Sequence, residues 1–178
     1  MLVPARRGRA SLLLAHGAAA AFEDVVATAS KRAYLTRRNA NTLLRVELES
    51  GETTPVADLG AFADDDGIAD LGAMIEHEGR LFVQVRRFNE NAPQGLAAPA
   101  YLAVVDLATE TVVDVDPATP GVQAIELAGT APKHRMQILP EVRRLYVSAS
   151  GGFFDQGGLE AIDLDALRGY KDKVVGQL

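Results

Sequence analysis

The fold is decided by the stretch from Arg80 to Thr111, in which two short apolar segments are followed by a turn. The first segment is RLFVQV (Arg80–Val85), the second is YLAVVDL (Tyr101–Leu107), and the turn is ATET (Ala108–Thr111). A polar segment with Asn, Pro and Gly separates the two apolar ones. Short segments rich in β-branched and aromatic residues, bounded by turn residues, are typical of strands. The stretch therefore predicts two antiparallel strands of one sheet.

The same order of segments occurs three times along the chain. It appears earlier as RAYLT (Arg32–Thr36) and LLRVELESGE (Leu43–Glu52), and later as RLYVS (Arg144–Ser148) and LEAIDL (Leu159–Leu164). Each first segment carries an aromatic residue at the same place: Tyr34, Phe82 and Tyr146. Each second segment carries an acidic residue before a leucine: Glu47-Leu48, Asp106-Leu107 and Asp163-Leu164. Such recurrence predicts a protein built from structural repeats.

The length and patterning of the repeat indicate which kind of repeat protein this is. Leu48, Leu107 and Leu164 are 59 and 57 residues apart, whereas a four-stranded propeller blade takes about 40–50 residues. Long loops such as residues 88–100 account for the excess. The first segment of each repeat, which would be the second strand of its blade, is apolar on both faces. In Arg80–Val85, for example, Leu81, Val83 and Val85 lie on one face and Phe82 on the other. Such a pattern is typical of a blade packed between two neighbours. We therefore predict an all-β fold, a partial β-propeller of about three four-stranded antiparallel blades.

Turn residues place the three blades at about residues 22–60, 68–116 and 133–178. Ala166–Arg168 predicts one helical turn near the end of the third blade. Residues 1–21 form a lead-in or a signal-like segment, because three arginines precede an apolar run from Ser11 to Phe22. That run is too short to span a bilayer, so we expect no membrane span. A signal-like start in a chain without cysteine points to a periplasmic or extracellular location, and a cytoplasmic one stays open.

Composition excludes several classes of function. The chain has 178 residues, of which 48% are hydrophobic, and a formal net charge of −6. A chain of this length can bury the core of one domain. Binding to nucleic acid needs clustered Lys and Arg to neutralise phosphates, and the acidic balance argues against it. Because there is no cysteine, disulfides and thiolate metal sites are excluded.

Two of the repeats carry a recognisable family pattern. AYLTRRN (Ala33–Asn39) and LYVS (Leu145–Ser148), each followed by a strand ending in acid-Leu, resemble the YVTN-type β-propeller repeat, a group similar to quinoprotein-dehydrogenase-like propellers. DGIADLGAM (Asp66–Met74) with RLFV and VDLAT also resembles bacterial secreted or lipoprotein propellers. The resemblance covers about residues 22–164. It implies the fold and says little about activity, since such propellers are binding surfaces and scaffolds as often as enzymes.

The number of repeats departs from the family pattern, because a closed propeller has at least four blades. Two interpretations stay open. Either the chain is a fragment or a truncated relative, or copies of it associate to complete a ring. Two copies of three blades make six, and an unclosed arc leaves blade faces bare. We therefore expect self-association.

One acidic loop is a candidate metal site. Asp64, Asp66 and Asp70 surround Gly67, and carboxylates near a glycine turn suit a hard cation such as calcium. The spacing lacks the complete calcium-loop pattern with its closing Glu. A solvated turn is the alternative, and no other cofactor is expected.

Two polar segments are candidate ligand-binding loops. Lys133, His134 and Arg135 lie in the connection that leads into the third blade, where they could meet an anionic ligand. Arg87, Asn89 and Asn91 lie in the long second crossing, which is the most adaptable polar surface of the chain. The partner could be a protein or a small molecule.

No nucleophile motif supports an enzymatic interpretation, since the chain has no Gly-x-Ser-x-Gly elbow. The leading hypothesis is a non-enzymatic binding or scaffold module of the bacterial cell envelope. The alternative is a propeller enzyme of lyase, lactonase or dehydrogenase type. Its polar residues would converge on the central channel.

Overall fold

The protein was studied as a computed structural model that describes residues 22–89, 91, 99–130, 132–149 and 158–170. The first blade is a four-stranded antiparallel sheet of β1 (Phe22–Ala27), β2 (Arg32–Arg37), β3 (Thr42–Glu47) and β4 (Thr53–Asp58), in that order. Pro55 lies in the edge strand β4, where its missing N–H breaks no ladder. The signal-like segment 1–21 lies outside the described residues.

The second blade contains β5 (Leu71–His77), β6 (Arg80–Val85), β7 (Ala100–Asp106) and β8 (Thr111–Val112). A further strand, β9 (Ile125–Leu127), pairs with the other half of β7. β8 and β9 together thus form a fourth strand that is split by residues 113–124. Two prolines lie in this insertion, Pro117 and Pro120, and proline cannot donate to a ladder. The ladder of β8 with β7 therefore ends at Val112, after which the N–H of Val113 makes one more bond, to the carbonyl of Val104 at 2.8 Å.

The third blade contains β10 (Pro132–Leu139), β11 (Arg144–Ala149), β12 (Gly158–Asp163) and β13 (Arg168–Gly169). The helical elements of the described residues are short 3-10 turns, among them η1 (Gly60–Phe62) and η3 (Pro140–Val142). The helical turn expected at Ala166–Arg168 is wrong, because residues 164–167 form a turn and Arg168 begins β13. Leu167 adopts a φ of 50° there and packs into the core between the second and third blades.

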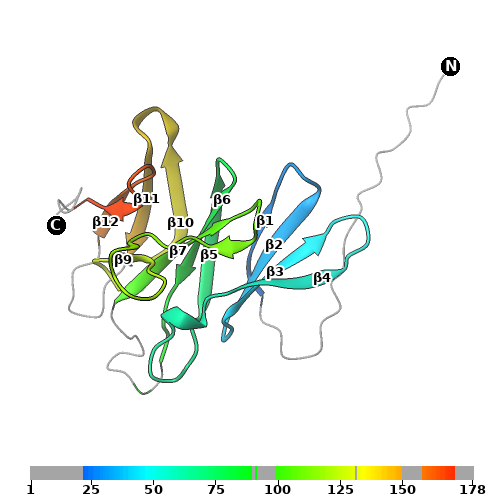
Figure 1. The fold of residues 1–178 in the computed structure, drawn as a ribbon, viewed down its shortest axis with the longest axis horizontal. Coiled ribbons are helices and arrows are strands. Elements are labelled where there is room, and N and C mark those ends of the chain that lie inside the picture. Colours follow the sequence, from blue (N-terminus) through cyan, green and yellow to red (C-terminus); the bar gives the residue numbers. More distant parts are fainter. Residues whose placement is uncertain (1–21, 90, 92–98, 131, 150–157, 171–178) are drawn as a thin grey trace.

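The three sheets form an arc with blade 2 in the middle (Figure 1). Strands β1 and β10 both lie against β5, so the first strand of each blade is innermost. This is the arrangement of propeller blades around a central axis. The predicted fold class, an all-β partial propeller of about three antiparallel blades, is confirmed, with four strands in blades 1 and 3 and five in blade 2.

The same hydrogen bond recurs at the same place in each blade. The amide N–H groups of Leu48, Leu107 and Leu164 donate to the carbonyls of Lys31, Gly79 and Arg143, at 3.1, 2.8 and 3.1 Å. Each acceptor is the residue just before the arginine that begins the second strand. The acid-Leu pattern of the sequence thus marks a structural position. Its aspartates also hold the following turn, since Asp106 and Asp163 each accept backbone N–H groups two and three residues ahead.

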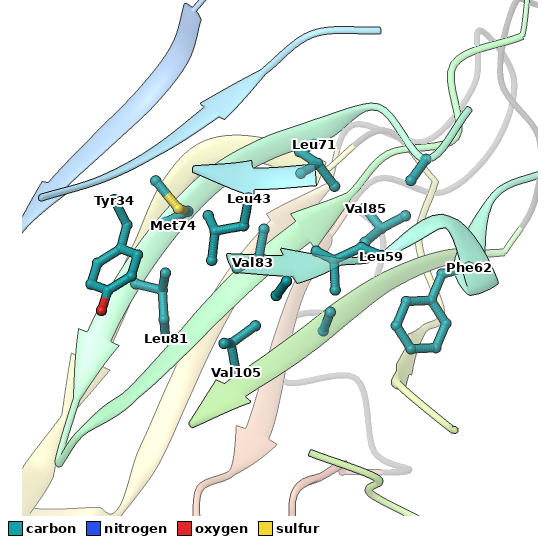
Figure 2. Close-up of a cluster of buried hydrophobic side chains, with 13 residues drawn as sticks. Tyr34, Leu43, Leu59, Phe62, Leu71, Met74, Leu81, Val83, Val85 and Val105 are labelled. Atoms are coloured by element: carbon teal, nitrogen blue, oxygen red, sulfur yellow. The ribbon is translucent and has the colours of Figure 1, made fainter. Parts of the chain in front are cut away.

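The core lies between the blades. One buried cluster joins blade 1 to blade 2, with Tyr34 and Leu43 on one side and Leu81, Val83 and Val105 on the other (Figure 2). A second cluster joins blade 2 to blade 3 and contains Phe82, Leu102, Leu145 and Ile162, among others. Blade 2 is therefore apolar on both faces, as the alternation of Leu81, Val83 and Val85 with Phe82 predicted.

Candidate functional site

The two ends of the arc differ in structure. At one end, which we call the loop end, β1, β5 and β10 begin and β2, β6 and β11 finish. It is drawn at the bottom of Figure 1. The opposite end, the turn end, carries tight turns such as Glu78–Gly79. Loops held by a rigid scaffold are where binding residues concentrate, so the loop end is the candidate functional site.

Side chains of blade 1 fix the connection that leads into blade 2. Asn41 accepts the N–H of Ala69 at 2.7 Å through Oδ1 and donates to the carbonyl of Gly67 at 3.0 Å through Nδ2. Asp70 accepts the backbone N–H of Asn39 at 3.1 Å through Oδ1. These bonds satisfy backbone groups that a loop would otherwise leave to water. The connection is therefore held at two points by the preceding blade.

The end of β6 is tied to the same connection. The N–H groups of Arg86 and Arg87 donate to the carbonyls of Asp70 and Ala69, both at 3.1 Å. Asn39, Asp70 and Arg87 have positive φ angles of 56°, 55° and 52°. Residues at the turn end have such angles too, among them Glu110 and Arg143, so this conformation alone does not mark a functional site.

A carboxylate and two guanidinium groups form an ionic cluster at the start of β1. Glu23 has a side chain only 7% exposed and pairs with Arg86 at 2.7 Å and with Arg38 at 3.4 Å. Arg86 is itself mostly buried, whereas the side chain of Arg38 is 55% exposed. A buried ion pair contributes little net stability but costs several kcal/mol, of order 3–5, if one partner is removed. Blades 1 and 2 are thus joined at the loop end by charges as well as by apolar packing.

The acidic loop is joined to the long second crossing of blade 2. Burial raises the pKa of Asp64, but hydrogen bonds from Asp66 and Asn89 and the charge of Arg87 together hold it below the usual range. The N–H of Ile68 lowers the pKa of Asp66, yet the hydrogen bond to Asp64 and its negative charge leave it raised. Arg87 donates to the carbonyl of Pro99 at 2.9 Å and lies over the ring of Tyr101. The pKa of Asp64 is thus lowered and that of Asp66 raised, because the two carboxyl groups share a hydrogen bond.

Among the described residues of the loop end, Asp70 is the most buried carboxyl group, at 1% exposure. Burial raises its pKa, while the N–H groups of Asn39 and Phe88 oppose that rise. Its Oδ2 atom has no hydrogen-bond partner among the described residues. A buried carboxylate oxygen without a partner favours the protonated form.

Blade 3 reaches the loop end through the backbone of β10. Gln84 donates to the carbonyl of Lys133 at 2.7 Å through Nε2 and accepts the N–H of Ala73 at 3.3 Å through Oε1. One side chain therefore links the innermost strands of blades 2 and 3. The side chain of Lys133 is exposed.

The structure brings some of the predicted site residues together and separates others. Arg87 and Asn89 lie beside Asp64, and Asp66 lies close enough to Asp70 to influence its pKa. Lys133 lies at the same end of the arc, and the exposed Asn91 donates its backbone N–H to Asn89 Oδ1 at 2.9 Å. Arg135 instead lines a hollow on the side of blade 3 that faces away from blade 2. The side chain of His134 lies outside the described part of the structure.

Sequence reasoning missed the residues that hold the loop end together: Glu23, Arg38, Asn41, Gln84 and Arg86. The signal was present in the two arginine pairs, Arg37-Arg38 and Arg86-Arg87, because each lies where the second strand of a blade ends. Repeated placement at the same position distinguishes them from scattered surface charges.

The candidate calcium site stays a prediction. Within the described ranges, no group of three or more His, Asp or Glu side chains is arranged to hold a metal ion. Two of the three aspartates use an oxygen to accept N–H groups of their own loop, since Asp64 accepts from Asp66 and Asp66 from Ile68.

Comparison with known proteins supports the fold. No family model matches the chain, and no curated protein matches it. A solved structure that matches with a TM-score above 0.5 is a propeller-type protein. It is a chain of a nidogen/laminin complex, with a TM-score of 0.56 and 12% sequence identity over 88% of this chain and 49% of that chain. The present chain thus spans about half the length of that neighbour.

Two further matches have lower TM-scores. Hydrazine synthase of Kuenenia stuttgartiensis has a TM-score of 0.37 and 12% identity over 82% of this chain and 46% of that one. A GH43 protein from Bacillus licheniformis has a TM-score of 0.44 and 10% identity over 87% of this chain and 30% of that one. Membership of the YVTN-type group remains a prediction. In the described part of the chain, no helix has the length and apolarity needed to cross a membrane.

Proposed function

We propose that this chain is a non-enzymatic binding or scaffold module whose contact surface is the loop end. The observation that carries this proposal is the network between loops of consecutive blades. Asn41 and Asp70 tie blade 1 to the inter-blade connection, and Gln84 ties blade 2 to blade 3. A surface held in this way loses little conformational entropy when it binds a partner.

The ligand that this surface suits is an anionic group, such as the carboxylates of an acidic peptide. Two cations of the loop end reach solvent, since the Arg38 side chain is 55% exposed and Lys133 is exposed. They belong to blades 1 and 3, so a ligand that contacts both would lie across blade 2. We place the module in the bacterial cell envelope, on the basis of the signal-like start of the sequence.

A fluorescein-labelled oligoglutamate peptide tests this proposal by fluorescence anisotropy with the full chain. The double variant Arg38→Glu/Lys133→Glu reverses two charges and should weaken binding at least tenfold. Lys31→Glu is the matched control, because Lys31 is an exposed lysine of the turn end that pairs with Glu49. Equal affinity of the double variant and the control would contradict the proposal.

One observation favours the alternative, a propeller enzyme. Asp70 is a buried carboxyl group with a raised pKa and an oxygen without a partner, and a proton-transfer residue needs a pKa near the working pH. A simple γ-lactone is a suitable probe for the lactonase class. Turnover by the full chain that Asp70→Asn abolishes, with the fold retained by circular dichroism, would favour the enzyme over the binding module.

A further inference from the structure

Each junction between blades uses the same positions of the repeat. Blade 2 presents Met74, Leu81, Val83 and Val105 to blade 1. Blade 3 presents Met136, Leu145, Val147 and Ile162 to blade 2, at the same places in the strand register. The corresponding residues of blade 1 are Val25, Ala33, Leu35 and Val46. They lie on the side of blade 1 that faces away from blade 2, which we call the blade 1 outer face.

The opposite side of each blade is also repeated. Tyr34 and Leu43 of blade 1 pack against blade 2, and Phe82 and Leu102 of blade 2 pack against blade 3. In blade 3 these positions are Tyr146 and Leu159, which line a hollow of about 550 Å³ together with Gln137, Leu139 and Ser148. We call this side the blade 3 outer face.

A polar contact follows the same rule. Thr36 donates its hydroxyl hydrogen to the carbonyl of Gly72 at 2.7 Å, which joins blade 1 to blade 2. Gln84, at the same register position, donates to the carbonyl of Lys133 at 2.7 Å, which joins blade 2 to blade 3. Ser148 occupies this donor position in blade 3 and lines the hollow of its outer face, where its hydroxyl makes a long bond of 3.5 Å to the carbonyl of Arg135 in the same blade. The blade 3 outer face therefore has both the apolar residues and the donor of an internal junction.

The blade 1 outer face has the residues of the other half of a junction. Ala33, Leu35 and Val46 line a second hollow of about 550 Å³, with Val25 and Leu48 at its rim. Val25 is 58% exposed, whereas Met74 at the same register position is 6% exposed between blades 1 and 2. Leu48 is 40% exposed, whereas its counterpart Leu164 is buried. Val25 and Leu48 are thus accessible on blade 1, whereas Ala33, Leu35 and Val46, at the floor of the hollow, are 3%, 5% and 1% exposed.

A third feature concerns the turn after the third strand. Its residue with positive φ contacts the aromatic residue of the preceding blade: Glu110 bonds to Tyr34, and Leu167 lies in one cluster with Phe82. The corresponding residue of blade 1 is Gly51, with a φ of 76°. A glycine there leaves room for the ring of Tyr146 from a neighbouring blade.

We propose that two copies of this chain close into a six-bladed ring. In each of two equivalent junctions, the blade 1 outer face of one copy packs on the blade 3 outer face of the other. The occupant is a second copy because both halves of a junction, in matching register, are carried by one chain. A two-fold axis closes such head-to-tail contacts and leaves no blade face open, and six blades lie within the range of closed propellers.

Sedimentation velocity of the full chain at tens of micromolar tests the ring. We expect twice the 18.9 kDa mass of the chain. Val25→Asp on the blade 1 outer face and Ser148→Arg on the blade 3 outer face should each give the monomer mass, with an unchanged far-UV circular dichroism spectrum. Val122→Asp is the control and should leave the dimer intact, because Val122 is 46% exposed in the insertion of blade 2, on neither outer face.

Mixing the two variants separates a ring from other assemblies. The Val25→Asp copy retains its blade 3 outer face and the Ser148→Arg copy retains its blade 1 outer face, so one native junction forms and dimer reappears in the mixture. A monomer of wild-type chain at all concentrations would overturn the proposal. So would a mass that keeps growing with concentration, which indicates open filaments, or a dimer that only one of the two variants disrupts.

Discussion

The hydroxyl of Tyr34 in blade 1 donates to Oε1 of Glu110 in blade 2 at 2.9 Å, across a junction in which the tyrosine is 1% exposed. Arg45 holds the other oxygen of Glu110 at 2.6 Å. Burial, together with the hydrogen bond and charge of Glu110, raises the pKa of Tyr34 to about 12. The two blades are therefore joined at the turn end by a charged network, just as Glu23 and Arg86 join them at the loop end.

Removing the Tyr34 hydroxyl should destabilise the fold. We expect Tyr34→Phe to lower the free energy of unfolding by about 2 kcal/mol, because the lost hydrogen bond is partly buried and its acceptor is charged. Urea denaturation measures this change. Tyr170→Phe is the control, since its hydroxyl bonds to Asp163 at an exposed site, and we expect a change within about 0.5 kcal/mol. If both variants lose the same free energy of unfolding, the Tyr34–Glu110 bond between blades 1 and 2 stabilises the fold no more than an exposed bond does.

The same network predicts a loss of stability in acid. Burial raises the pKa of Glu110, but the hydrogen bonds from Arg45 and Tyr34 outweigh this and lower it from 4.5. A carboxyl group with a lowered pKa stabilises the folded state above its unfolded pKa, and this contribution disappears as pH falls through the folded pKa. Glu110→Gln should flatten the decline of melting temperature below pH 4.5. If the melting temperature of Glu110→Gln falls with pH just as that of the wild-type chain does, the Glu110 carboxylate does not cause the loss of stability in acid.

Asp70 should have the opposite effect. Its pKa is raised from 3.8 by burial, so the folded state binds more protons than the unfolded state and stability falls as pH rises from 3.8 through the folded pKa. Asp70→Asn should raise the melting temperature at pH 7, because asparagine tolerates the φ of 55° and retains the acceptor for Asn39. The exposed Asp65→Asn is the control. A lower melting temperature of Asp70→Asn at pH 7 would contradict this account.

A methyl group at Gly129 should disrupt the connection between blades 2 and 3. A Cβ there would lie 2.7 Å from Cβ of Ala149, and the Gly129 N–H donates to Glu160 at 2.6 Å. We expect Gly129→Ala to cost about 1–3 kcal/mol in thermal or urea unfolding. In Gly169→Ala the nearest atom is Ile162 Cδ1 at 3.9 Å, an ordinary contact, so this variant serves as the matched control. Similar stabilities of the two variants would disprove the close approach.

Hydrogen exchange should distinguish the blades. Blade 2 has a buried cluster on each face, so the amides of β6 and the paired part of β7 should exchange most slowly. Slow exchange marks segments whose opening requires global unfolding. Mass spectrometry of peptic peptides can compare β6 with β2 and β11. Equal protection of the three strands at a concentration where the chain is monomeric would show that blade position has no effect.

The sequence by itself determined the second and third strands of each blade, their threefold recurrence and the two apolar faces of blade 2. Strand β6 begins and ends where RLFVQV predicts it, because alternation and turn chemistry act over a few neighbouring residues. By the same local rule, the aromatic and acid-Leu positions identified the residues that form the junctions and turns.

Only the tertiary structure decided which polar residues meet. Asp70 and Asn39 are 31 positions apart, and Asn41 and Ala69 are 28 apart, so no local pattern relates them. The strand β9 exists because Ile125–Leu127 pair with Ala100–Leu102 of β7, and Arg135 lines the outer hollow of blade 3, within an irregular part of the pairing of β10 with β11. Contacts between distant residues follow from how whole sheets stack, since burial of the apolar faces between blades sets which loops lie side by side.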